Sequence, residues 1–232
     1  MIYTTRVPSS WKAAAIVGVL GVVGLSTGSV SGLSAPQDDQ YVTQKRDLDT
    51  FDGILVKGAI EVIVTAGEDQ SVEVRTRADR QENVKTYLDG STLVIDMDNP
   101  SRKWSDFWNE TDVDVTISME TLKKLDISGA VDGRIKNLKT DTFELDLRGA
   151  ADLDIEGTCD SAIYDVKGAG DIDARDFECA EVDVHVKGAG SASVYARDAV
   201  DATVSGVGSI SVYGNPDKVN KSVGGIGSIS IK

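Results

Sequence analysis

Acidic side chains at matching positions of successive segments are the residues of this sequence that could bind a cation. Asp152 and Asp154 stand three and five residues after one glycine, and Asp171 and Asp173 stand at the same distances after another. If the two segments lie side by side, the four carboxylates gather in one patch and repel one another unless a cation, a proton or water intervenes. Oxygen ligands suit Ca²⁺. The sequence therefore offers a calcium site here, with repulsion relieved by solvent as the alternative.

Few other residues could carry catalysis or hold a metal. The 232 residues include one His and two Cys, too few for a His-rich or Cys-rich zinc site. No Ser or Cys is expected beside His185, so we assign it no chemistry. The formal net charge of −14 disfavours nucleic acid as a partner, because phosphate binding needs a basic face. We therefore expect neither an enzyme nor a nucleic-acid-binding protein.

A glycine-centred string recurs along the chain and indicates its architecture. Around each glycine, apolar residues alternate with Asp, Ser, Lys, Arg or Thr, which is the period of a strand with one buried face. We interpret each repeat as a strand, a tight corner at a glycine with positive φ, a second strand and a turn. The last six glycines are 20, 19, 20, 18 and 19 residues apart; the full set is Gly58, Gly129, Gly149, Gly168, Gly188, Gly206 and Gly225.

Repeats of about 19 residues are too short for helical crossovers between parallel strands. Two arrangements remain: a parallel β-helix-like solenoid whose coils stack about 4.8 Å apart, or the antiparallel hairpins of a sandwich. Like residues recur at like positions, as stacked coils require, which favours the solenoid. We therefore predict an all-β solenoid over residues 47–232, with a less regular but still β-rich part before residue 122.

The two cysteines fit this stacking. Cys159 and Cys179 each stand nine residues before a repeat glycine, Gly168 and Gly188 respectively. Stacked coils would place their Cα atoms about 5 Å apart, within the range that a disulfide accepts. Because an exported protein meets oxidising conditions, we predict a Cys159–Cys179 disulfide. Two free thiols in a turn are the alternative.

Outward positions beside the glycines form two kinds of column. Aspartates three residues before the glycines neighbour Arg or Lys one residue before them, which predicts a solvated ladder of charge pairs worth about 0–1 kcal/mol each. Serines fill the positions after the later glycines, as a hydroxyl surface for a glycan or protein, or as β-compatible filler. The ladder residues are Asp126, Asp146, Asp165, Arg148, Lys167 and Lys187, and the serines are Ser191, Ser193, Ser209, Ser211, Ser228 and Ser230.

One aromatic cluster, Trp104, Phe107 and Trp108, lies in a polar segment before the regular repeats. Aromatic rings among polar neighbours can stack on sugars or dock a partner. Such a segment can also fold over one end of a solenoid as a cap. The sequence leaves both interpretations open.

Residues 1–35 have the composition of a secretory signal peptide. Arg6 and Lys12 precede an apolar run at residues 13–25, and small residues follow. The run is shorter than the roughly 20 residues of a membrane span, although continuation through Val30 leaves an uncleaved anchor open. We place the cleavage at residues 28–35 and interpret residues 36–46 as a flexible linker.

The strings FDGILVKGAIEVIVTAG, VDVTISMETLKKLDISGA and the terminal KGAG and VGSISV resemble the bacterial DUF2807 family, the head GIN domain of putative auto-transporter adhesins. The resemblance covers about residues 47–231, and the repeated G-x-G-[SD]-[IA] pattern is its most specific feature. It implies an exported, non-catalytic, β-helical domain of the cell envelope, with no established catalytic residues.

Three functions agree with these observations. The first, which we expect, is an adhesin-like binding or scaffold module of the envelope, in the periplasm or at the surface. The second is a polysaccharide-active β-helix enzyme that would use Asp152 and Asp173 as a paired acid and base. The third is a structural or regulatory protein that binds another envelope protein. The expected partner is an envelope protein or glycan, and a homodimer could form through residues 228–231, which have no visible cap.

Overall fold

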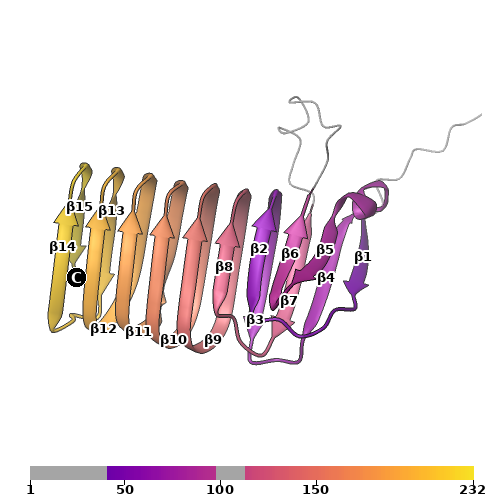
Figure 1. The fold of residues 1–232 in the computed structure, drawn as a ribbon, viewed down its shortest axis with the longest axis horizontal. Coiled ribbons are helices and arrows are strands. Elements are labelled where there is room, and N and C mark those ends of the chain that lie inside the picture. The colour runs from indigo at the N-terminus through magenta and orange to yellow at the C-terminus, as the bar shows by residue number, and fades with distance from the viewer. Residues whose placement is uncertain (1–40, 98–112) are drawn as a thin grey trace, which may run out of the picture. The chain divides into compact units, whose positions relative to one another are not determined.

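Alternating apolar and polar residues place most of the described chain in strands, and these wind into the predicted parallel β-solenoid (Figure 1). The computed structural model describes residues 41–97 and 113–232. The first part contains β1 (Tyr41–Arg46), β2 (Gly53–Lys57), β3 (Ala59–Ala66), β4 (Ser71–Arg77), the 3-10 helix η1 (Ala78–Asn83), β5 (Lys85–Asp89), β6 (Thr92–Asp96) and β7 (Asp114–Met119). The second contains β8 (Lys124–Ile127), β9 (Ala130–Leu147), β10 (Ala150–Val166), β11 (Ala169–Val186), β12 (Ala189–Val204), β13 (Val207–Tyr213), β14 (Lys218–Val223) and β15 (Ile226–Ile231).

Each coil has two faces, and the long strands contribute to both. The first half of β9 pairs with β3 and its second half pairs with β8, because the strand bends near its middle. β10, β11 and β12 repeat this course in parallel, with Ala150 opposite Ala169 and Val166 opposite Val186. We call the two sides the β3 face, which ends in β15, and the β2 face, which ends in β14. The glycine edge holds the corner glycines, and the bend edge is where the long strands bend.

The corner glycines stack so closely that a side chain has no room. A Cβ on Gly149 would lie 1.8 Å from the carbonyl oxygen of Gly129, and one on Gly168 would lie 1.8 Å from that of Gly149. Of the seven repeat glycines only Gly58 has a positive φ, at 137°. The sequence-based reason was therefore wrong for the other six: glycine is needed because adjacent coils approach closely.

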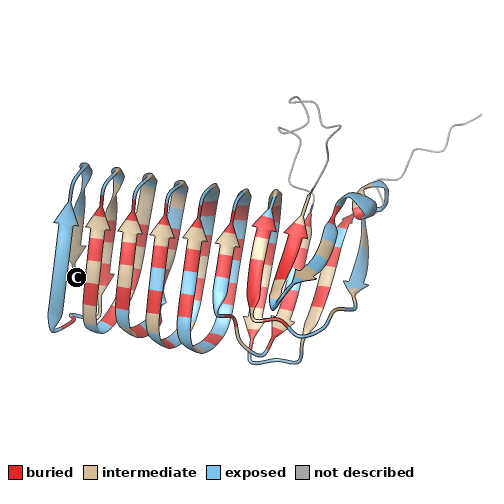
Figure 2. Ribbon diagram, in the orientation of Figure 1, coloured by how far each residue is buried: buried red, intermediate tan, exposed pale blue. Residues whose placement is uncertain are grey.

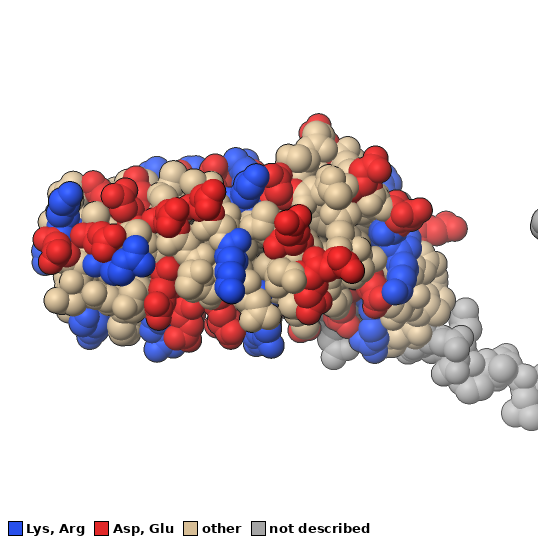
Figure 3. Space-filling model, turned by 90° about the horizontal axis from the view of Figure 1, so that it is seen from below, with Lys and Arg blue, Asp and Glu red and all other residues tan. Residues whose placement is uncertain are grey.

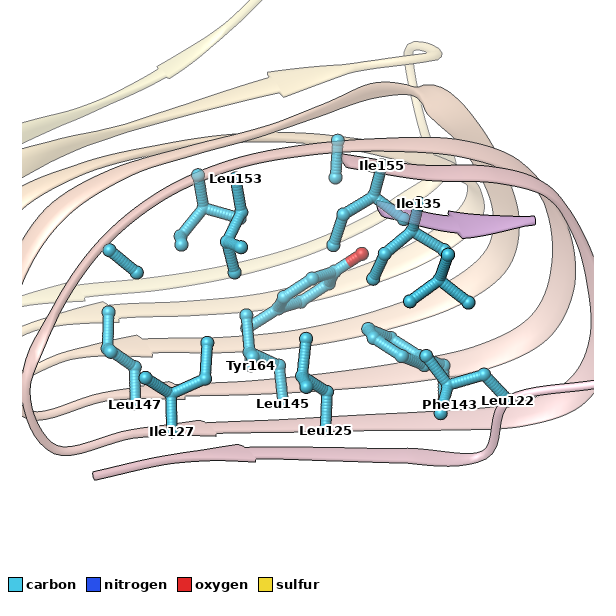
Figure 4. Packing of buried hydrophobic residues seen from close by; sticks show 14 of the residues in the cluster. Leu122, Leu125, Ile127, Ile135, Phe143, Leu145, Leu147, Leu153, Ile155 and Tyr164 are labelled. Atoms are coloured by element: carbon cyan, nitrogen blue, oxygen red, sulfur yellow. The ribbon is translucent and has the colours of Figure 1, made fainter. Parts of the chain in front are cut away.

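Inward residues of both faces form one continuous core (Figure 2). The side chains point from the two faces toward one another and fill the space between them (Figure 4). The Phe143 ring meets the rings of Tyr164 and Phe177 edge to face, with centroids 6.2 Å and 5.5 Å away. Burial raises the pKa of the Tyr164 hydroxyl. One coil cannot bury its own apolar residues, so the stacking of neighbours holds the solenoid together.

Antiparallel strands extend the sheet beyond the first coils. One of them shows that the predicted linker is wrong over part of its length. Residues 41–46 of the predicted linker at 36–46 form β1, which pairs antiparallel with β4. The buried Gln81 amide donates to the carbonyl oxygens of Val42 and Val74, which ties β1 to β4. Polar side chains made β1 resemble a linker because it is an edge strand exposed to solvent.

Within 41–97 and 113–232, no helix is long and apolar enough to cross a membrane. The signal-peptide prediction for residues 1–35 lies outside the described residues and stays a prediction. The same holds for the rest of the linker, residues 36–40.

Candidate functional site

The disulfide position lies just after the bend edge, where β10 and β11 run in register. Cys159 is opposite Cys179, their Cα atoms are 4.5 Å apart, and the structure joins them by a disulfide. Both residues are buried. The bond would link two coils that are already hydrogen-bonded, so its expected role is structural.

The four predicted calcium ligands lie together on the β3 face, in two opposed pairs. Asp152 is opposite Asp171, and Asp154 is opposite Asp173. Arg134 Nη2 lies 3.4 Å from Asp154, and the Ser191 hydroxyl donates to Asp171.

Asp173 is already bound by an arginine that would compete with a calcium ion. Arg175 Nε donates to both of its carboxylate oxygens, at 2.8 Å and 3.1 Å, and this pairing holds the pKa of the Asp173 carboxyl below its ordinary value. Within the described ranges, no three His, Cys, Asp or Glu side chains are grouped closely enough to hold a metal ion. The geometry therefore gives the calcium prediction no support beyond the shared face.

The charge ladder on the β2 face is confirmed. Arg148 Nη2 lies 3.3 Å from Asp126 and 2.7 Å from Asp146, so it bridges two coils. Lys167 Nζ continues the ladder, 3.3 Å from Asp146 and 2.7 Å from Asp165. Hydrogen bonds from Arg148 hold the pKa of the Asp146 carboxyl below its ordinary value. The ladder balances the charge of these carboxylates along the face.

Opposite charges also alternate along the bend edge. Figure 3, which looks onto this edge from below the view of Figure 1, shows acidic and basic side chains interspersed. The excess of acidic residues is therefore not gathered into one patch in this view.

The serine columns continue the β3 face toward its end. Ser191 is opposite Ser209, which is opposite Ser228. In the neighbouring column the hydroxyls of Ser211 and Ser230 lie 3.3 Å apart. These columns form a regular hydroxyl surface, in agreement with both interpretations of the sequence.

The structure describes His185 but not the aromatic cluster. His185 Nε2 lies 3.0 Å from Asp183 Oδ1 on the β2 face, and we still assign it no chemistry. The aromatic cluster of Trp104, Phe107 and Trp108 lies outside the described residues, so its assignment as cap or contact site stays a prediction.

Sequence reasoning missed a hollow at the bend edge near the last coils. Tyr195 and Tyr213 lie side by side in register on β12 and β13 and line this hollow with Arg175 and Asn215. The available signal was periodic, because each tyrosine stands seven residues after a repeat glycine. Tyrosines at one position of successive coils must become neighbours when the coils stack.

Comparison with known proteins identifies relatives of this fold. The family model described as "Putative auto-transporter adhesin, head GIN domain" (DUF2807) matches residues 50–216. No curated protein matches the chain.

Solved structures give the same architecture. A putative adhesin from Bacteroides fragilis is similar with a TM-score of 0.66 and 23% identity, over 83% of this chain and 97% of that one. A putative lipid binding protein from Parabacteroides distasonis is similar with a TM-score of 0.51 and 21% identity, over 84% of this chain and 98% of that one. At these identities the likeness shows the fold.

Proposed function

Because the chain belongs to the DUF2807 family of putative auto-transporter adhesin head GIN domains, we propose that it is an exported, non-catalytic binding module of the cell envelope. The proposed role is adhesin-like, with an envelope protein or a glycan as the partner. Two regular outward faces on a stacked solenoid support contact over an extended surface. The location proposed is the periplasm or the cell surface.

The observation that carries the non-catalytic part is the pairing of carboxylates with cations on both faces. Arg148 bridges Asp126 and Asp146, and Arg175 holds Asp173. The pKa values of the Asp146 and Asp173 carboxyls are lowered, whereas a general acid working near neutral pH needs a raised pKa. Asp173 is one of the two residues that the polysaccharide-enzyme alternative requires, and Arg175 occupies both of its carboxylate oxygens, so it would have to be released before it could act as the base of a pair; we therefore do not propose that alternative.

Binding of the labelled, purified full chain to intact bacterial cells tests the proposal. Parallel samples contain a polysaccharide panel or lipid vesicles, the latter because one structural neighbour is titled a lipid binding protein. Each is run with and without EDTA. Saturable binding to cells is the expected result, and we expect EDTA to leave it unchanged because arginines already neutralise two of the clustered aspartates.

The outcomes separate the candidate functions. Loss of binding in EDTA would return a metal ion to the Asp patch. An absence of saturable binding to cells and to both panels would overturn the adhesin-like role and favour a protein that binds only another envelope protein.

A further inference from the structure

The tyrosine hollow at the bend edge combines aromatic rings with several kinds of polar group. It has a volume of about 620 Å³ and is open to solvent. Tyr195 and Tyr213, both half-buried, supply its aromatic surface. Its polar lining comes from four side chains, which are Arg175, Asp176, Asn215 and Lys232.

The guanidinium of the hollow is held in place before any ligand arrives. Arg175 Nε donates to both carboxylate oxygens of Asp173, and Nη2 also contacts that carboxylate. On its other side, Arg175 Cζ lies 5.9 Å from the centroid of the Tyr213 ring. Arg175 also forms a side-chain hydrogen bond with Tyr213, so the guanidinium is fixed from both sides at the wall of the hollow.

A tight turn after Tyr213 fixes the opposite wall. Gly214 and Asn215, in the connection between β13 and β14, have positive φ angles of 96° and 54°. A Cβ on Gly214 would lie 2.3 Å from the carbonyl oxygen of Ala196 and 2.9 Å from Cε1 of Tyr195. The turn therefore closes on the Tyr195 ring and places Asn215 in the lining of the hollow. These constraints make the hollow a preformed feature of the backbone.

We propose that this hollow binds a neutral pyranose unit of a cell-envelope saccharide. A tyrosine ring offers an apolar surface for the C–H face of a sugar. Guanidinium, carboxylate and carboxamide groups together supply the donors and acceptors that neighbouring sugar hydroxyls need. The proposal rests on the proposed function for the source of the saccharide, but the hollow itself does not depend on it.

The charge of the hollow selects a neutral sugar over an acidic one. Arg175 and Lys232 contribute two positive charges, and Asp173 and Asp176 contribute two negative charges in the same cluster. These side chains leave no net positive charge to attract a carboxylate or phosphate. An open hollow with this much polar lining also suits a hydroxyl-rich ligand better than an apolar one, since apolar ligands favour enclosed apolar sites.

Titration of the full chain with neutral hexoses and N-acetylhexosamines, and with oligosaccharides of each, tests the proposal by calorimetry and NMR shift changes. Tyr213→Ala should weaken binding about tenfold or more, because the ring surface is lost. Tyr213→Phe keeps that surface and should stay within about threefold of the parent. Asn215→Gly, which tolerates the positive φ, should also weaken binding.

A second arginine-stacked tyrosine provides the matched control. The ring of Tyr41 lies 4.6 Å from Arg75 Cζ on β1 and β4, away from the hollow. Tyr41→Ala should leave saccharide binding unchanged. The site assignment is overturned if no neutral saccharide binds, if Tyr213→Ala and Asn215→Gly both bind as the parent does, or if Tyr41→Ala loses as much.

The two proposals fail in different ways. Saturable binding to cells that survives Tyr213→Ala, with no saccharide bound, would retain the binding module and remove this site. Saccharide binding at the hollow without binding to cells would retain the site and remove the adhesin-like role. Acidic sugars binding better than neutral ones would overturn the choice of ligand.

Discussion

The corner glycines are the single residues whose replacement the fold should tolerate least. The carbonyl oxygen of Gly149 accepts a hydrogen bond of 2.9 Å from the Ala169 N–H, and a Cβ on Gly168 would lie 1.8 Å from the same oxygen. An added methyl group must therefore push two coils apart and break their ladder. Interior overpacking of this kind costs about 3 kcal/mol or more.

Gly168→Ala should lower the free energy of unfolding by about that amount, measured by urea denaturation. Gly224→Ala is the control, because the nearest atom to its Cβ would be the Val204 oxygen at 4.0 Å. This control should stay within about 0.5 kcal/mol of the parent. Equal urea midpoints for the two variants would contradict the close-approach argument.

The Cys159–Cys179 bond is a second prediction at this scale. Intact mass under native conditions should be lower by two hydrogen atoms than after reduction, and neither thiol should react with an alkylating reagent. The closed loop spans a sequence separation of 20, so reduction should destabilise the fold by about 3 kcal/mol. Two alkylatable thiols in the native, unreduced protein would refute the bond.

The charge ladder acts at the scale of the strands, because each cation joins neighbouring coils of the β2 face. Arg148 lowers the pKa of the Asp146 carboxyl in the folded state relative to the unfolded chain. A lowered pKa contributes stability above the unfolded value, near 3.8, and this stability is lost as the pH falls through the folded pKa. The protein should therefore unfold more easily in urea at pH 3 than at pH 6.

Arg148→Met tests the origin of this dependence. It removes the cation but keeps an aliphatic stem, so the loss of stability on acidification should become smaller. Arg197→Met is the control, because Arg197 pairs with its exposed neighbour Asp198 and bridges no coils. If the two variants lose the same amount of stability on acidification, the ladder does not contribute to the pH dependence of stability.

The regular elements could be predicted from the sequence because stacked coils repeat their pattern. The strands and the charge ladder follow from periodicity, and the Asp89-Gly90 sequence is a hairpin turn signal across which β5 and β6 pair. β1 was missed because an exposed edge strand needs no apolar alternation. The tyrosine hollow was missed because it depends on how side chains from four successive coils meet, which the residue pattern alone does not specify.

At the scale of the whole solenoid, the two ends are protected differently. The first coils end in the antiparallel strands β1 and β5, whereas β14 and β15 are parallel continuations of the coils at the other end. Val219 and Val223 continue core columns above Val200 and Val204, yet they are 43% and 48% exposed. Apolar residues and unpaired backbone groups at such an end favour pairing with another chain, so the end-to-end homodimer stays a proposal.

Lys221 should limit that pairing. It is opposite Ala202, in an inward column whose lower members are buried, so it places a cation where another coil would need an apolar side chain. Two copies that met through this end would bring their Lys221 ammonium groups toward the same apolar surface. Inward-pointing charges of this kind protect the edges of natural sheets from pairing with another chain. The parent should therefore associate weakly.

Lys221→Val should convert this weak association into a tighter one, by about tenfold or more in the dimer dissociation constant measured by sedimentation velocity over a concentration series. Lys218→Val removes the same charge from an outward position opposite Ala199, so it should leave association unchanged. A parent that is already a tight dimer, unaffected by Lys221→Val, would show that its interface lies elsewhere. Monomers for the parent and both variants at every concentration would show that this end does not pair with a second copy, and the homodimer would have to be abandoned.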